Sequence, residues 1–180
     1  MDQSGTILLT STGLSSKSVY DKFTEIVTFN KFKKAVIITT ASEDKEKNQY
    51  TQLAFSQLKS GGLEVVDFYD FESDKPKDVS LYDVIYVCGG NTFKLMKFAR
   101  EMNFDKSIRS LLEKGGLYIG VIAGSLIVGP SIQIANEVEP DKNEVGLVDF
   151  QGFNITELII YPHYSLGIEN EIKFFEDKNN

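Results

Sequence analysis

The feature that most constrains the fold is a regular alternation between short apolar runs and stretches with helical periodicity. Between the runs, apolar residues recur at the three- and four-residue spacing of an amphipathic helix. Strands and helices that alternate with short connections predict a parallel sheet covered by helices on both faces. We therefore expect a three-layer, doubly wound, mostly parallel α/β fold, formed as a single domain over residues 1–180. The five runs expected as strands are residues 6–10, 35–39, 63–68, 84–87 and 117–120.

Local signals predict where some of these elements begin and end. Ser42 is expected to cap the helix that stops at Gly61 and Gly62, and Asn91 or Thr92 is expected to cap the helix that follows the fourth strand. Beyond Ile132 the pattern is less regular. Two further short strands are expected there, at residues 147–150 and 158–161.

Composition excludes several classes of partner. A net charge of −7 argues against nucleic-acid and anionic-membrane partners, and no apolar run is long enough to span a membrane. The N-terminal residues lack the basic and apolar regions of a signal peptide. A single cysteine forms no internal disulfide, which fits a reducing cytoplasm. We therefore expect a cytoplasmic protein whose partners are small molecules or other proteins.

Unusual residues follow three of the predicted strands, and the carboxyl ends of parallel strands are where such sheets place their sites. These stretches are residues 88–92, 120–125 and 162–164. In the first, Gly89 and Gly90 precede a helix, where exposed N–H groups suit an oxyanion or phosphate. The competing interpretation is an ordinary tight turn with a helix cap, and this motif alone favours it.

The second stretch, GVIAGS, has the outline of a nucleophile elbow, a sharp turn between a strand and a helix with small residues beside the nucleophile. Ile122 stands where the serine or cysteine of such an elbow is expected. Its side chain has no attacking atom, and a β-branched residue suits a strained turn poorly. Ser125 is an alternative nucleophile in a shifted frame, although hydrogen bonding near the start of the helix is its simpler role.

His163, the only histidine, follows a strand-like run and a proline, where a general base is one role and an idle loop residue the other. Cys88 is a second alternative nucleophile, although a buried cysteine more often serves as a small apolar residue. One cysteine and one histidine give no metal cluster, and no dinucleotide or P-loop pattern is present, so neither a metal nor a cofactor is expected.

Taken together, YVCGGNTFKLM, LYIGVIAGSLIVGP and YPHY resemble the dipeptidase E family of serine peptidases, relatives of cyanophycinase. The family pattern is G-G-G-N-T-F, then G-x-S-A-G-[AS], then P-H-[FY]. The resemblance covers roughly residues 5–165. It implies a flavodoxin-like or class I glutamine amidotransferase-like fold. It also implies a Ser–His–acid site that hydrolyses short peptides, in some members those with an N-terminal aspartate.

Residue by residue, the resemblance places Ile122 at the nucleophile, His163 at the general base, and the N–H groups of Gly90 and Ala123 at the oxyanion hole. Cys88 replaces the first glycine of the G-G-G-N-T run. The family's further C-terminal strand, which supplies the third catalytic group, has no counterpart here. Glu169 and Glu171 match no family motif, so the acid is unassigned.

These departures predict a member of the family without efficient peptidase activity, which binds a short peptide, an amino acid or a protein. The alternatives are a hydrolase that uses Ser125 or Cys88, a non-catalytic interaction module, and a shortened form of an active enzyme. A sheet edge left exposed by the short C-terminus favours pairing with another chain, so a homodimer is a further hypothesis.

Overall fold

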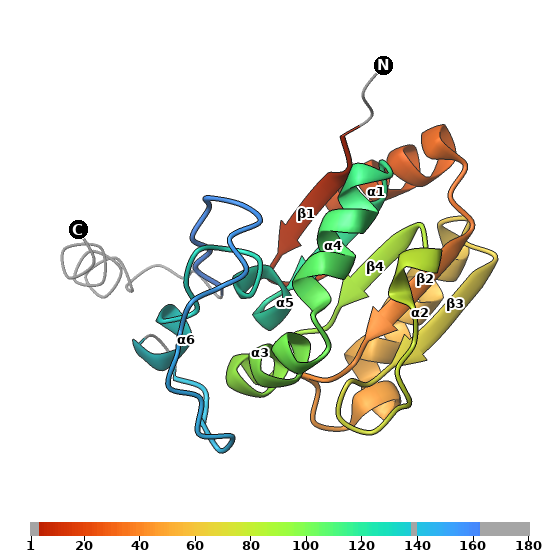
Figure 1. The fold of residues 1–180 in the computed structure, drawn as a ribbon. Coiled ribbons are helices and arrows are strands. Elements are labelled where there is room, and N and C mark those ends of the chain that lie inside the picture. The colour runs from red at the N-terminus through yellow and green to blue at the C-terminus, as the bar shows by residue number, and fades with distance from the viewer. Residues whose placement is uncertain (1–3, 138–139, 163–180) are drawn as a thin grey trace.

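The computed structural model describes residues 4–137 and 140–162. In the described residues, one five-stranded, all-parallel sheet has the strand order β1-β5-β4-β2-β3 (Figure 1). The five strands expected from the sequence are confirmed, with shifts of one or two residues at their ends. They are β1 (Thr6–Thr10), β2 (Lys34–Ile38), β3 (Val65–Tyr69), β4 (Val84–Val87) and β5 (Leu117–Val121).

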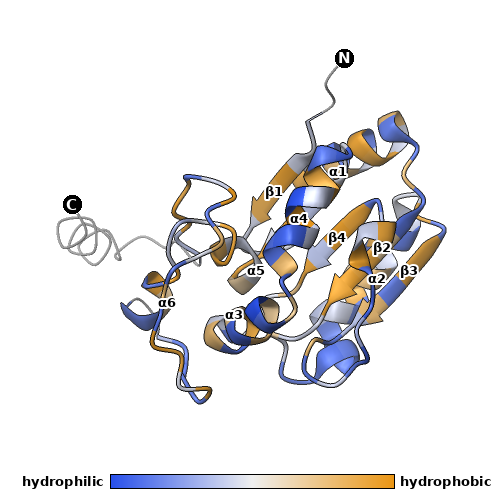
Figure 2. Cartoon of the chain, viewed as in Figure 1, coloured by the Kyte–Doolittle hydropathy of each residue, from blue (hydrophilic) through white to orange (hydrophobic). Residues whose placement is uncertain are grey.

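Helices cover both faces of this sheet, as the alternation predicts. The helices are α1 (Lys17–Asn30), α2 (Gln49–Ser60), α3 (Thr92–Glu101) and α4 (Phe104–Glu113). The buried side chains form two apolar clusters, one containing α1 and α2 residues such as Phe23 and Leu58, the other containing α3 and α4 residues such as Phe93 and Ile108. Figure 2 shows this division as apolar strands flanked by helices with polar outer surfaces. The three-layer α/β architecture is therefore confirmed.

The helix caps are partly as expected. Asn91 caps α3, where its side-chain oxygen accepts a hydrogen bond from the Lys94 N–H at 2.9 Å. The prediction for Ser42 is wrong, because α2 begins later and Asn48 caps it. The Ser42 N–H instead donates to the Thr39 carbonyl in a turn, and a short 3-10 helix (Lys45–Lys47) precedes α2.

The strands expected at residues 147–150 and 158–161 are absent from the described part of the chain, where residues 140–162 run as an irregular segment beside the short helices α5 (Ala123–Leu126) and α6 (Ile134–Glu137) (Figure 1). Its backbone N–H groups bind carbonyls of the loop after α5: Phe153 donates to Ile127, and Ile155 to Val128. Several of its apolar side chains pack on the cluster around α3 and α4. Leu147, Phe150, Ile160 and Tyr161 are thus apolar because they pack on this cluster and not because they belong to the sheet, while Val148, Leu158 and Ile159 are exposed.

No helix within residues 4–137 and 140–162 is long and apolar enough to cross a lipid bilayer. The sheet leaves β1 and β3 at its two edges in the described structure, each with one neighbouring strand. Because all five strands are parallel, the loops after β1, β2, β4 and β5 lie at the same end of the sheet, its carboxyl end. This is where the sequence predicts a site.

Candidate active-site cavity

A cavity of about 470 Å³ opens at the carboxyl end of the sheet. Its walls come from the loops after β1, β2, β4 and β5 and from the first turn of α2. Ile122, Gly90 and Cys88 all line it, so three of the residues singled out in the sequence share one cavity. The full lining is Ser11, Thr12, Ser42, Glu43, Asn48, Tyr50, Thr51, Tyr86, Cys88, Gly89, Gly90, Val121 and Ile122.

Ile122 occupies the turn between β5 and α5 in a strained backbone conformation, with φ 46° and ψ −104°. Only glycine adopts positive φ without steric cost, and a β-branched residue there is a genuine outlier. Strain of this kind costs on the order of 1–3 kcal/mol and persists only where the surroundings impose it. The strand, sharp turn and helix of a nucleophile elbow are thus present, with an isoleucine at the apex.

Hydrogen bonds on both sides hold this turn. The Ile122 N–H donates to the Thr10 carbonyl at 3.0 Å, extending the pairing of β1 with β5. Its carbonyl accepts from the N–H groups of Ser125 at 2.9 Å and Leu126 at 3.0 Å. Since all these contacts use the backbone of residue 122, the turn does not depend on which side chain it carries.

The CGGNTF loop packs directly against the Ile122 side chain. A Cβ added to Gly89 would lie 3.0 Å from Ile122 Cδ1, so the isoleucine covers this glycine. A Cβ on Gly90 would lie 2.1 Å from the Ala41 carbonyl oxygen, and Gly90 has a φ of 130°. Both the space and the backbone conformation therefore require glycine at position 90.

Two backbone donors at this edge of the sheet are without partners. Among the described residues, neither the Gly90 N–H nor the Ala123 N–H donates a hydrogen bond. Gly90 lines the cavity, and Ala123 follows Ile122 as the first residue of α5. Ala123 is fully buried, and a buried N–H without a partner is uncommon in proteins, which makes a bound acceptor an economical explanation there. Gly90 is exposed, so its N–H is open to solvent and to a ligand in the cavity.

Ser125 is fully buried and does not line the cavity. Its Oγ accepts a hydrogen bond from the Thr10 N–H at 3.1 Å and lies within donating distance of the Thr10 and Gly120 carbonyls, at 3.0 and 2.9 Å. These contacts join the ends of β1 and β5. They favour the structural role of Ser125 over a role as nucleophile.

Cys88 lines the cavity but is only 6% exposed. Burial raises the pKa of its thiol to about 11, although a hydrogen-bond contact with Thr51 Oγ1 at 3.5 Å partly offsets the rise. The thiolate is the reactive form of cysteine, and it is scarce at neutral pH when the pKa is raised. This environment is that of an unreactive thiol.

His163, the predicted general base, lies outside the described residues, as do Glu169 and Glu171. Within the described residues, the turn at Ile122, the glycine loop and Cys88 lie at one cavity. The role of His163 as general base stays a prediction. Of the described residues, no group of three or more His, Cys, Asp or Glu side chains is arranged to hold a metal ion.

Sequence analysis missed the cavity residues contributed by β1 and β2. Ser11 and Thr12 directly follow β1, and Ser42 and Glu43 follow β2 closely. The rule that sites form at the carboxyl ends of parallel strands applies equally to these loops and was enough to include them. Tyr86 was missed for another reason: it lies within an apolar run, where an aromatic residue resembles ordinary core.

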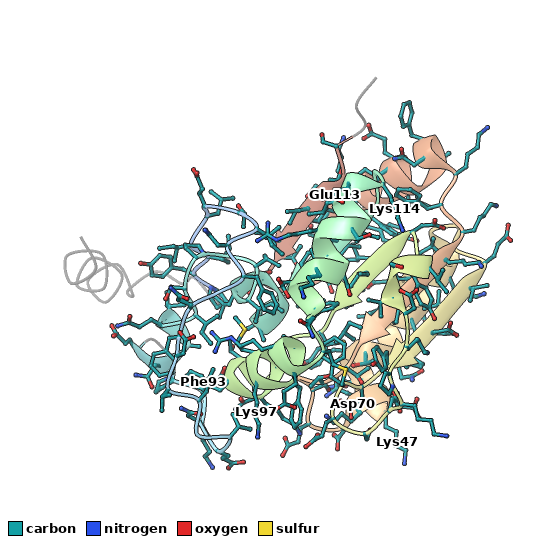
Figure 3. All side chains as sticks on the ribbon, in the orientation of Figure 1. Lys47, Asp70, Phe93, Lys97, Glu113 and Lys114 are labelled. Carbon is teal, nitrogen blue, oxygen red and sulfur yellow. The ribbon has the colours of Figure 1, made fainter. Side chains whose placement is uncertain are left out.

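A cluster of ion pairs fixes the loop between β2 and α2. The Lys45 ammonium lies 3.1 Å from Asp70, 3.0 Å from Glu72 and 3.2 Å from the Thr40 carbonyl, and Lys94 on α3 lies 2.6 Å from Glu72. Burial alone would raise the pKa of Asp70, but hydrogen bonds from Ser73, the Glu72 N–H and Lys45 outweigh it and hold the pKa below its ordinary value. Figure 3 shows Asp70 at the carboxyl end of the sheet, on the same side as Lys47.

Comparison with known families gives a match that covers almost the whole chain. The pattern of peptidase family S51 matches residues 7–179. An uncharacterized peptidase of Listeria monocytogenes is 32% identical over 155 residues, which are 84% of this chain and 75% of the relative. Peptidase E of Escherichia coli is 31% identical over 134 residues, which are 73% of this chain. This chain spans about half of that enzyme, 55% of its length.

Solved structures agree with these sequence matches. A crystal structure of a protein from Listeria monocytogenes EGD-e, described as a peptidase E protein, superposes with a TM-score of 0.72 at 25% identity, covering 97% of this chain and 87% of the other. A crystal structure of a peptidase from an acI-B1 actinobacterium gives a TM-score of 0.70 at 18% identity, covering 97% and 76%. The α/β fold with a parallel sheet flanked by helices is that of peptidase E, which confirms the fold implied by the sequence motifs.

Proposed function

Because the chain belongs to peptidase family S51, we propose that it binds short peptides in the cavity at the carboxyl end of the sheet without hydrolysing them efficiently. A short peptide is the simplest ligand to propose for a member of a peptidase family. The loss of efficient hydrolysis is argued from this chain's own residues.

The observation that carries the proposal is Ile122 at the apex of the elbow. In a serine peptidase the apex hydroxyl attacks the carbonyl carbon, and a general base takes its proton. An isoleucine side chain supplies neither an attacking atom nor a proton. It also covers Gly89 with apolar carbon at the place where the reacting carbonyl would lie. Without the nucleophile, an oxyanion hole and binding alone leave a rate about a thousandfold above that in water, far below enzymatic turnover.

We assign the remaining parts of the site from the resemblance. Gly90 and Ala123 are the oxyanion donors, supported by their unpartnered N–H groups. His163 is the general base in this assignment. The donors would bind the carbonyl oxygen of a peptide whether or not it reacts, so the same groups that served catalysis suit ligand binding. Ser125 and Cys88 are poorly placed to replace the lost nucleophile, because one is bonded to the sheet and the other is a thiol of raised pKa.

The direct test restores the hydroxyl. We expect the native protein to bind dipeptides by calorimetry while showing no turnover above about a thousandfold over the uncatalysed rate. Ile122→Ser places a hydroxyl on a turn already in the elbow conformation, so hydrolysis should rise by at least about a hundredfold if His163 acts as its base. The measurement is release of free amino acids from a dipeptide panel.

Ile122→Ala is the matched control, since it opens the cavity equally but adds no nucleophile. Turnover that rises in both variants would mean that cavity volume, and not the hydroxyl, limits the native protein. Efficient hydrolysis by the native protein, abolished by His163→Ala, contradicts the proposed loss of activity. Failure of every dipeptide to bind contradicts the proposed ligand class.

A further inference from the structure

The cavity carries an unbalanced charge. Of its thirteen lining residues, Glu43 alone is charged, and no lysine or arginine of the described chain lines it. A carboxylate at the wall of a cavity attracts a cationic group and repels a second carboxylate. The cavity can therefore discriminate between ligands by the sign of their charge.

The Glu43 carboxylate has no ionic partner among the described residues, where it makes neither a hydrogen bond nor an ion pair. The nearest lysine along the chain, Lys45, is already held by Asp70, Glu72 and the Thr40 carbonyl. Lys45 is therefore not available to neutralise Glu43. Glu43 is exposed, and among the described residues its charge at the cavity is left without an ionic partner, whereas Asp70 and Glu72 are paired with Lys45.

Two hydroxyls deeper in the cavity are also without partners. Ser42 and Tyr86 are 6% and 5% exposed, and within the described residues neither hydroxyl makes a hydrogen bond. Neither hydroxyl is sealed from solvent, and both residues line the cavity. Burial raises the pKa of Tyr86, so its hydroxyl remains a neutral donor. Buried polar groups are normally hydrogen-bonded, and here a polar ligand would satisfy them without adding charge.

We propose that the cavity binds peptides with a cationic side chain, an ammonium or a guanidinium, in preference to those with an acidic side chain, and that Glu43 is the residue that selects them. The inference rests on the proposed peptide binding. It departs from the N-terminal aspartate implied by the resemblance, because an aspartyl carboxylate would meet Glu43 with no described cation in the wall. Ser42 and Tyr86 hydrogen-bond the peptide's polar groups and leave the charge preference to Glu43.

The test compares ligands that differ in charge at constant shape. Binding of Asp-Leu and Asn-Leu, and of Lys-Leu and norleucyl-Leu, is measured by calorimetry at about pH 8, where an ordinary histidine is neutral. At low ionic strength we expect Asn-Leu to bind about threefold to tenfold more tightly than Asp-Leu, and Lys-Leu to exceed norleucyl-Leu by a similar factor. Both ratios should shrink as salt is added, since part of the cavity is open to solvent.

Glu43→Gln removes the charge and keeps the shape, so both ratios should fall towards one. Glu46→Gln is the matched control, because Glu46 lies in the same loop, outside the cavity, and its loss changes net charge equally. Unchanged ratios in Glu43→Gln, or tighter binding of Asp-Leu to the native protein, would overturn the inference while leaving peptide binding intact. Absence of binding by all four peptides would overturn peptide binding and this inference together.

Discussion

Residue 122 shows how a backbone can keep a conformation that its side chain disfavours. The φ of 46° at Ile122 is imposed by the hydrogen bond that its N–H donates to the Thr10 carbonyl and by those that its carbonyl accepts from Ser125 and Leu126. Catalytic elbows tolerate such strain because the apex side chain is needed there. Here the strain remains although the side chain has no attacking atom, which indicates that the turn was shaped for another side chain.

A glycine–alanine comparison measures this strain. Both Ile122→Gly and Ile122→Ala remove the isoleucine beyond Cβ, so their difference isolates the backbone. We expect the glycine variant to be more stable than the alanine variant by about 1 kcal/mol, because glycine accepts positive φ. Urea unfolding gives the two free energies. At Lys106, an exposed position in α4, the order should reverse by a similar amount, and the same order at both sites would contradict strain at residue 122.

The site was partly predictable from the sequence, for reasons that lie in individual residues. Gly90, Cys88 and Ile122 follow buried strands. Because sites form at the carboxyl ends of parallel strands, the sequence was enough to predict that these residues lie close together. Ser125 joins the ends of β1 and β5 through its side-chain hydroxyl, and these long-range bonds to Thr10 have no sequence signal. The charge of the cavity was not predictable, because whether Glu43 is paired depends on where Lys45 points.

A hydrogen bond from the Thr10 N–H to Ser125 Oγ joins β1 to α5, and its contribution to the free energy of unfolding is measurable. Ser125→Ala leaves the Thr10 N–H without its acceptor at the end of β1, and we expect a loss of about 1–3 kcal/mol in the free energy of unfolding. Ser107→Ala, on α4, should change it by less than about 0.5 kcal/mol. If Ser125→Ala were as stable as the native protein, the structural role given to Ser125 would be wrong.

The five strands were predictable and the last two were not. Runs such as residues 84–87 are apolar throughout, which marks strands buried on both faces. Residues 147–150 and 158–161 are also apolar in part, and some of their side chains pack on the cluster around α3, while the residues between them, 152–156, bond to loop carbonyls. Periodicity reports which side of a segment is buried; it does not report whether a strand edge is available to pair with it.

The whole molecule carries a net charge of −7, and the cluster around Lys45 pairs two of its carboxylates, those of Asp70 and Glu72. The pKa of Asp70 is held below its ordinary value, and so is that of Glu72, through hydrogen bonds from Lys94 and Lys45. A depressed carboxylate pKa stabilises the fold above the unfolded-state value, about 4, and that contribution is lost as the pH falls through the folded-state pKa. The cluster therefore supports the fold near neutral pH and fails in acid.

Removing Lys45 tests this dependence. Lys45→Met should lower the free energy of unfolding by about 1–2 kcal/mol at neutral pH, and the difference from the native protein should narrow below about pH 4 as Asp70 and Glu72 become protonated. Urea unfolding across that pH range measures both values. Lys47→Met, in the same loop and outside the cluster, should show little change at either pH. A pH-independent difference for Lys45→Met would contradict the electrostatic explanation.

The way the elbow is held has a consequence for the history of such a protein. Since neighbouring backbone groups, and not the apex side chain, fix the turn, residue 122 is exchangeable without rebuilding the fold. A lineage that loses its nucleophile in this manner keeps the scaffold in which a nucleophile would work. Substitution at this one position can then remove or return the apex side chain while the fold stays the same, so relatives with and without a serine there would share a structure.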